Sequence, residues 1–146
     1  MRVEQAQPAD LSELVPLFDG YRSYFAGGEP DGSQEFLEER LRLQDSVIFV
    51  ARQADAMIGF VQLYPIFSSW YVRRVWFLSD LFVADPSRGQ GVAQALLEHV
   101  REFLEEGEGR SVMVELPRRE PHLYKLYERA GYTRDPDFDL YRLFRK

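Results

Sequence analysis

Apolar and polar positions alternate along this chain with two different periods, which predicts a mixture of strands and helices. Residues 75–83 form the strongest predicted strand, because only Ser79 and Asp80 are polar among its nine residues. Such a run is typical of a central strand that is buried on both faces. Shorter strand-like segments cover residues 2–6, 47–51, 57–64 and 111–116, with up to two more around residues 138–144.

Four segments have the period of amphipathic helices. They begin near Asp10, Ser33, Val92 and Pro121. Asp10 and Glu13 have the spacing of a capping box, and Ser33 is the expected cap of the second helix. Pro16 removes one internal hydrogen bond, so the first helix should be kinked or begin late. Residues 26–32 and 65–73 read as loops, and the whole pattern predicts an α+β fold with a mixed sheet.

The composition fits one domain spanning residues 1–146, since a chain of this length buries enough surface for a full core. The chain has no cysteine, which excludes disulfides, sites with Cys ligands and acyl-cysteine intermediates. No apolar run exceeds the five residues 47–51, and the N-terminus lacks the apolar core of a signal peptide. We therefore expect a cytoplasmic protein that does not enter a membrane.

The formal net charge of −6 argues against a nucleic-acid partner, because nucleic-acid binding depends on Lys and Arg that neutralise phosphates. Two arginine pairs, Arg73-Arg74 and Arg118-Arg119, are the local exceptions. We interpret them as solvated loop charges.

The predicted central strand leads into the sequence Arg88-Gly89-Gln90-Gly91-Val92-Ala93 at the start of a helix. The first turn of a helix has unpaired N–H groups and a partial positive charge, so it favours an anion. Gly89 and Gly91 permit close approach of the backbone, and Arg88 adds a forked donor for phosphate oxygens. This arrangement suits two adjacent phosphates.

Three other interpretations of this loop compete with a site for two phosphates. A P-loop requires a Gly-Lys-Ser/Thr sequence, and the loop contains no lysine. A dinucleotide fingerprint requires a third Gly or Ala where this chain has Gln94, and it requires the loop to follow the strand directly. A glycine-rich turn without a ligand is the remaining alternative.

The segment Leu81–Ala93 resembles the signature of the GCN5-related N-acetyltransferases (GNAT), whose Arg/Gln-x-x-Gly-x-Gly/Ala loop binds the pyrophosphate of acetyl-CoA. The segment Leu126–Tyr132 is similar to the second motif of that family, a helix that carries Tyr and closes on Gly and an aromatic residue. The resemblance implies a three-layer α/β/α fold with four helices. It also implies a mixed, mostly antiparallel sheet of about six or seven strands, splayed near its central strand. Acetyl-CoA is the implied co-substrate, with no metal.

The resemblance also implies site residues. The backbone of Leu81 and Val83 would pair with the pantetheine arm, and an N–H near Phe82 would stabilise the developing oxyanion. Tyr127 matches a tyrosine that protonates the leaving thiolate, although it also lies on an apolar helix face. Glu120 replaces an Asn of the family, which puts that contact in doubt. The complete set of implied cofactor positions is Leu81, Phe82, Val83, Arg88, Gly89, Gln90, Gly91, Val92, Ala93, Glu120 and Tyr127.

The implied reaction is direct attack of a neutral amine on the thioester in a ternary complex. Asp80 and Glu115 are the candidate bases for the amine, while Tyr127 is the candidate acid. Asp80 has the alternative of a buried acid satisfied by backbone donors. We interpret His99 and His122 as structural.

The acceptor is predicted least sharply. Five acidic and aromatic residues of the two predicted loops and their borders suit a small cationic amine, an amino acid or a basic peptide: Glu29, Asp31, Tyr64, Trp70 and Tyr71. The aromatic residues also suit a core or a homodimer surface. Residues 64–69 and 76–81 resemble the histone and polyamine acetyltransferase branch. A non-catalytic acyl-CoA-binding domain is the main rival function, and a nucleotide-dependent enzyme is the third.

Overall fold

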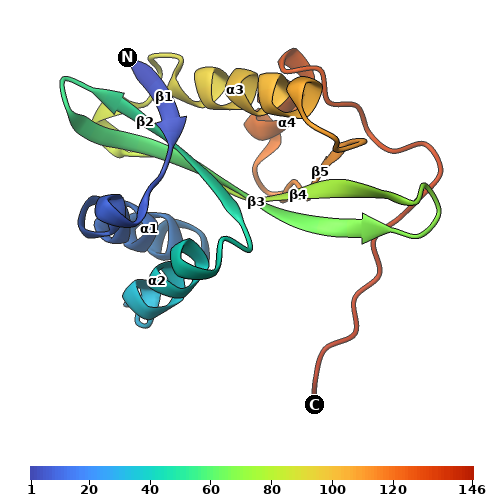
Figure 1. Ribbon diagram of the computed structural model, residues 1–146, viewed down its shortest axis with the longest axis horizontal. Helices are drawn as coiled ribbons and strands as arrows, with labels where there is room; N and C mark the ends of the chain where they lie inside the picture. The colour runs from blue at the N-terminus through green and yellow to red at the C-terminus, as the bar shows by residue number, and fades with distance from the viewer. The chain divides into compact units, whose positions relative to one another are not determined.

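One mixed sheet of five strands organises the computed structural model, which describes residues 1–146 (Figure 1). The strands are β1 (Arg2–Gln5), β2 (Val47–Gln53), β3 (Ala56–Ser68), β4 (Arg73–Val83) and β5 (Val112–Val114), in the spatial order β1-β2-β3-β4-β5. Neighbouring strands are antiparallel except β4 and β5, which are parallel. The predicted mixed, mostly antiparallel sheet is confirmed, with five strands instead of six or seven.

Helices cover both faces of this sheet. Figure 1 shows α1 (Leu11–Ala26) and α2 (Ser33–Leu43) on one face and α3 (Val92–Glu106) on the other. Two short 3-10 helices, η1 (Pro8–Asp10) and η2 (Asp85–Ser87), precede α1 and α3. Leu14 and Phe18 of α1 pack with Leu37 of α2 against Phe60 and Phe82 of the sheet, so the α1/α2 face holds one apolar core.

The chain forms two compact units, residues 1–115 and 116–146. The second unit contains α4 (Pro121–Arg129), which is capped by Ala130 and followed by Gly131 with a left-handed φ of 96°, so the predicted stop at this glycine is confirmed. The final strands predicted around residues 138–144 are wrong, because this segment contains no strand. Its large apolar side chains are 65–97% exposed, and an apolar run forms a strand only where a neighbouring strand pairs with it.

Two further predicted boundaries differ from the structure. The predicted loop 65–73 is mostly strand, because β3 continues to Ser68 and β4 begins at Arg73, leaving four residues for the turn. Cross-strand pairing extends both strands beyond their buried parts. The strand predicted over residues 111–116 shortens to β5, which pairs only with residues 76–78 of β4.

The predicted helix caps are also wrong in detail. The helix α1 begins directly at Leu11 and includes Pro16. The Asp10 carboxylate accepts the N–H of Gln7 at 2.7 Å instead of an N–H of α1. Gly32 is the cap of α2, with a left-handed φ of 77°, while the Ser33 hydroxyl accepts a hydrogen bond from Arg22.

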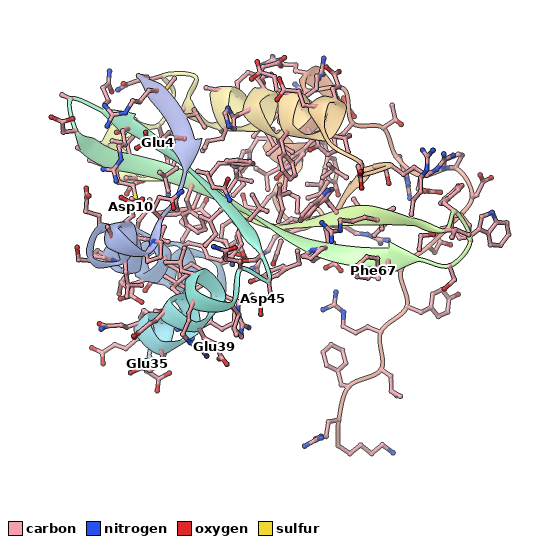
Figure 2. All side chains as sticks on the ribbon, in the orientation of Figure 1. Glu4, Asp10, Glu35, Glu39, Asp45 and Phe67 are labelled. Atoms are coloured by element: carbon pink, nitrogen blue, oxygen red, sulfur yellow. The ribbon has the colours of Figure 1, made fainter.

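The buried side chain of Arg52 joins β2 to β1 and α1 through a cluster of charges. Its guanidinium donates to Glu4 at 2.9 Å, to Asp10 at 2.7 Å and to Glu13 at 3.0 Å. Figure 2 shows Glu4 and Asp10 at this junction between β1 and α1. The hydrogen bonds to Glu13, the largest cause, raise the pKa of Arg52 above its ordinary value.

Replacing Arg52 by Met should lower the free energy of unfolding by roughly 2 kcal/mol, because three carboxylates lose their common partner. This loss is smaller than that expected for a fully buried ion pair, because Glu4 and Glu13 are partly exposed. Urea unfolding measures the change. Arg42→Met is the matched control, because Arg42 is an exposed arginine of α2. Equal stability of both variants would contradict a structural role for the cluster.

Candidate functional site

A β-bulge at Ser79 divides β4 into two halves. In the register with β3, Leu78 pairs with Leu63 and Asp80 pairs with Gln62, so Ser79 has no partner. One extra residue exchanges the faces toward which all following side chains point. Asp80 therefore points to the opposite face of the sheet from Leu78, although regular alternation would put both on the same face.

The side chains of β4 contact different helices before and after the bulge. Before the bulge, the Trp76 ring packs against Phe103 of α3, with the ring centroids 5.1 Å apart. After the bulge, Phe82 belongs to the core beneath α1 and α2. Asp80 shares the face of Phe82, so a strand that reads as uniformly buried in the sequence delivers a carboxyl group to the α1/α2 side.

A cavity of about 470 Å³ lies on this side of the sheet, and Asp80 contributes to its wall. Its size is in the range of small-molecule sites. Aromatic rings make up much of the wall, and one arginine and two acids supply its charges. The residues that line it are Phe18, Tyr21, Arg22, Asp31, Gly32, Phe36, Tyr64, Ser79 and Asp80.

Asp80 is a buried carboxyl group, only 7% exposed. Burial raises its pKa above the ordinary value, while hydrogen bonds donated by the hydroxyls of Tyr21 and Ser79 partly oppose this rise. Burial also raises the pKa of Tyr64, and the charge of Asp80 adds to the effect. A carboxyl group with a raised pKa that lies in a cavity is suited to accept a proton.

The half of β4 that follows the bulge has one open edge. Ala84 donates its N–H to Ile58 on the β3 side. Because backbone directions alternate along a strand, the N–H and C=O groups of Leu81 and Val83 point to the other side. There β5 pairs only with residues 76–78, so the sheet is splayed as predicted. The N–H of Phe82 points to β3, so the open-edge donors nearest to it belong to Leu81 and Val83.

The glycine-rich loop connects this open edge to the N-terminus of α3. Gly89 and Gly91 have left-handed φ values of 76° and 80°, which the sequence pattern anticipates. Gly91 is the cap of α3, and Ala95 makes the first helical hydrogen bond to its carbonyl at 3.0 Å. The N–H groups of the first turn, from Val92 onward, have no acceptor inside the helix. Added Cβ atoms at either glycine would meet nothing within 4 Å, so the space above the loop is open.

Arg88 serves the loop itself more than the sequence suggests. Its Nε donates to the carbonyl of Val83 at 2.9 Å, and its Nη1 pairs with Asp85. The guanidinium also lies over the Tyr24 ring, 4.8 Å from the centroid. These contacts hold the loop against β4 and α1, and they leave the backbone amides as the main anion donors.

The predicted acceptor residues do not lie together. Asp31 and Tyr64 line the cavity of Asp80, whereas Glu29 is exposed and lies outside the cavity lining. Trp70, 82% exposed, and Tyr71 lie in the turn between β3 and β4. Their position in the sequence near Tyr64 is misleading, because the long hairpin carries them away from it.

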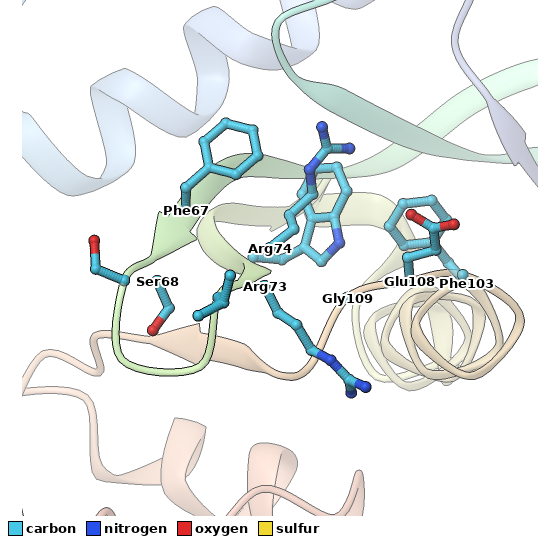
Figure 3. A pocket seen from close by; sticks show the side chains of 11 residues that line it. Phe67, Ser68, Arg73, Arg74, Phe103, Glu108 and Gly109 are labelled. Atoms are coloured by element: carbon cyan, nitrogen blue, oxygen red, sulfur yellow. The ribbon is translucent and has the colours of Figure 1, made fainter.

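A second cavity, of about 980 Å³, lies beside this hairpin (Figure 3). Arg73 and Arg74 line it together with Phe67, Trp76 and Phe103. The Arg74 guanidinium lies over the rings of Phe67 and Trp76, at 5.3 and 5.4 Å from their centroids. The arginine pair is therefore partly packed on aromatic rings. Neither Asp80 nor the glycine-rich loop contributes to this cavity.

The remaining predicted residues lie elsewhere. Glu115 is the exposed residue that follows β5 and does not line the cavity of Asp80. In the second unit, Glu120 is the cap of α4 and lies 3.4 Å from His122. Tyr127 is 4% exposed, and its ring packs edge-on against Tyr132 with the centroids 5.2 Å apart.

Comparisons with known proteins show which family the chain belongs to. The model of the Acetyltransferase (GNAT) family matches residues 14–132. This chain belongs to the GNAT acetyltransferase family. An uncharacterized N-acetyltransferase of Bacillus subtilis is 33% identical over 144 residues, which cover 98% of this chain and 97% of the relative. The crystal structure of a probable acetyltransferase superposes with a TM-score of 0.94 at 38% identity, covering 100% and 99% of the two chains.

A D-amino-acid N-acetyltransferase of Saccharomyces cerevisiae is 32% identical over 65 residues, which cover 44% of this GNAT chain and 40% of the yeast protein. The chain is an N-acetyltransferase, and its family implies acetyl-CoA as co-substrate. The residues present fit that molecule. An open strand edge, two left-handed glycines without obstruction and a helix N-terminus follow one another from Leu81 to Ala93.

The sequence pattern alone does not single out several residues that line the cavity of Asp80 in this GNAT chain. Phe18, Tyr21 and Arg22 follow helical spacing on α1, and the first two look like ordinary core residues. The signal that distinguishes them is Arg22, a charge next to an aromatic stripe. Only the bulge at Ser79 brings the aromatic residues of α1 opposite Asp80, and no residue pattern in the sequence predicts the bulge.

Proposed function

We propose that this acetyltransferase transfers the acetyl group of acetyl-CoA directly to a primary amine while both substrates are bound. One observation carries the proposal: the bulge of β4 places Asp80 in a cavity on one side, and the same strand continues as an open edge into the glycine-rich loop. One strand thus serves both substrates, and holding two reactants together removes much of the barrier.

The pantetheine arm would pair with the backbone of Leu81 and Val83, in the manner of an added strand. The pyrophosphate would bind the N–H groups of the loop and the first turn of α3, from Arg88 to Ala93. An N–H of Leu81 or Val83 is suited to stabilise the developing oxyanion. The edge of Leu81 and Val83 has no partner strand, and the first N–H groups of α3 have no intrahelical acceptor. The N–H of Arg88 donates to Asp85 at 3.2 Å and the carbonyl of Val83 accepts from the Arg88 side chain at 2.9 Å, so these two groups would have to exchange partners.

Asp80 and Tyr127 would carry out the two proton transfers of the reaction. The amine nitrogen forms a bond to the acetyl carbon, the carbon–sulfur bond breaks, and CoA leaves as the thiol. Asp80 accepts the proton that the nitrogen loses, and Tyr127 supplies a proton to the sulfur. Glu115 is the alternative base, although its exposure favours Asp80.

Two measurements test the proposal. Acetyl-CoA at millimolar concentration should raise the melting temperature. A panel of amines should then release CoA thiol, and the signal is unambiguous because the chain has no cysteine. Stabilisation without thiol release across the panel would favour the non-catalytic acyl-CoA-binding alternative. No stabilisation by acetyl-CoA, with stabilisation by NAD, would favour the nucleotide-dependent alternative.

Replacing Tyr127 by Phe should lower kcat about 10-fold or more and change the KM for acetyl-CoA less than two-fold, because only the hydroxyl is lost. The ring that packs against Tyr132 stays in place. Steady-state kinetics measures both constants. Tyr124→Phe on the same helix is the matched control. A Tyr127→Phe variant as active as the control would return Tyr127 to a packing role.

The acceptor is a small cationic amine, an amino acid or a basic peptide in this proposal. The yeast D-amino-acid N-acetyltransferase supports the second class, although it matches less than half of the chain. The family match runs from residue 14 to residue 132 across both units, which supports a single acetyltransferase domain.

A homodimer stays a prediction, supported by exposed aromatic side chains such as Phe67 and Trp70 on the β3–β4 hairpin. None of the helices combines the length and the hydropathy that a membrane span requires. The cytoplasmic location likewise stays a prediction.

A further inference from the structure

Arg22 brings a positive charge into the cavity that holds Asp80. Its Nη1 donates to the carbonyl oxygen of Asp31 and, at 2.9 Å, to the hydroxyl of Ser33. Both acceptors are neutral, and Arg22 forms no ion pair with a carboxylate. Its guanidinium is therefore held in place by neutral acceptors, without a salt bridge.

The contacts of Arg22 use only one edge of its fork. Ser33 is buried at the first turn of α2, so its hydroxyl is a fixed anchor. Asp31 offers its main-chain carbonyl, while its side chain is exposed and makes no ion pair with Arg22. The Nε and Nη2 atoms of Arg22 keep their hydrogens for another acceptor. A guanidinium suits a carboxylate in this situation, because two parallel N–H donors match its two oxygens.

The opposite charge in the cavity lies close by in the fold. Tyr21, the residue before Arg22 on α1, donates its hydroxyl to Asp80. The cavity of about 470 Å³ is thus lined by one guanidinium and by two acids, Asp31 and Asp80, and neither carboxylate forms an ion pair with Arg22. A ligand that bears both an amine and a carboxylate satisfies Asp80 and Arg22 at once.

We propose that the acceptor of this enzyme is an amino acid with an apolar side chain. Arg22 binds its carboxylate, its amine lies at Asp80, and the rings of Phe18, Phe36 and Tyr64 contact its side chain. The inference rests on the proposed acetyl transfer and narrows its acceptor. A diamine fits less well, because its second ammonium group would lie near Arg22, and like charges repel.

The test compares free amino acids with their methyl esters, using leucine, phenylalanine and the diamine putrescine as acceptors and thiol release as the readout. The free acids should have a kcat/KM about 10- to 100-fold above their esters, mostly through KM, because charge-assisted bonds to the carboxylate are lost in the ester. In Arg22→Gln this acid-to-ester ratio should collapse toward one. Arg22→Lys should keep part of it, and Arg42→Gln, an exposed control, should keep all of it.

A second measurement does not depend on turnover. Calorimetry should show that N-acetyl-leucine binds the wild-type protein about 10-fold or more tightly than its methyl ester, and that Arg22→Gln abolishes the difference. Equal use of acids and esters, preference for putrescine, or equal binding of the two products would overturn the amino-acid proposal while leaving acetyl transfer intact. If no acceptor releases CoA but N-acetyl-leucine still binds through Arg22, the proposed reaction fails and the carboxylate site stands.

Discussion

Replacing Gly91 by aspartate should weaken the binding of acetyl-CoA at least about 10-fold, equivalent to about 1.4 kcal/mol, and leave the fold intact. Gly91 has a φ of 80°, and an added Cβ would meet no atom within 4 Å. The aspartate side chain therefore enters open space at the N-terminus of α3. That space is where the proposed site holds two phosphates, and like charges at close range repel by several kcal/mol near a protein surface. Calorimetric titration with acetyl-CoA measures the loss.

Two controls separate charge from backbone strain. Gly91→Asn has nearly the same size and conformational preference but no charge, so it should bind acetyl-CoA more tightly than Gly91→Asp. Gly28→Asp places the same residue at a left-handed glycine of another loop, with a φ of 77° and nothing within 4 Å. It should cost stability by a similar amount without affecting acetyl-CoA. Equal affinity of all three variants for acetyl-CoA would contradict the binding of the pyrophosphate by this loop.

Gly91 also shows what the sequence can predict. Glycines at fixed offsets from a strong strand and an amphipathic helix report a local backbone geometry, and local geometry is what short motifs encode. The loop, the cap of α3 and the layered fold follow from such local signals, as does the stop of α4 just before Gly131.

The acceptor side of the site depends on contacts between residues that are distant in sequence. Tyr64 and Trp70 are six residues apart, yet the β3–β4 hairpin separates them. Arg22 and Asp80 are far apart in sequence, yet one cavity holds both. The deciding feature is the bulge at Ser79, which inverts the faces of β4. A bulge depends on the pairing of two strands, so the composition of one strand does not predict it.

Replacing Asp80 by Asn should lower kcat about 100-fold or more, because the amine loses the group that accepts its proton. In the wild-type enzyme, kcat should rise with pH as Asp80 loses its proton. An ordinary aspartate loses its proton near pH 4. Because burial raises the pKa of Asp80, the rise in kcat should lie at a higher pH than that. The pH profile of kcat in saturating substrates measures it. A rise of unchanged position in Asp80→Asn would assign it to another group, of which Arg22, Asp31 and Tyr64 face the same cavity.

Tyr21→Phe is the matched variant, and the hydrogen bond from Tyr21 to Asp80 determines in which direction it should shift the pH profile. The Tyr21 hydroxyl bond lowers the pKa of Asp80, so its removal should move the rise in kcat to higher pH while keeping the base. Stability gives an independent readout. A carboxyl whose pKa is higher in the folded state than in the unfolded state stabilises the fold at low pH, and this stabilisation is lost as the pH rises through the folded-state pKa. As the pH rises through the folded-state pKa of Asp80, the unfolding free energy of the wild type should therefore fall, whereas that of Asp80→Asn should not. A parallel pH dependence of stability in both proteins would mean that Asp80 is not the group that burial keeps protonated.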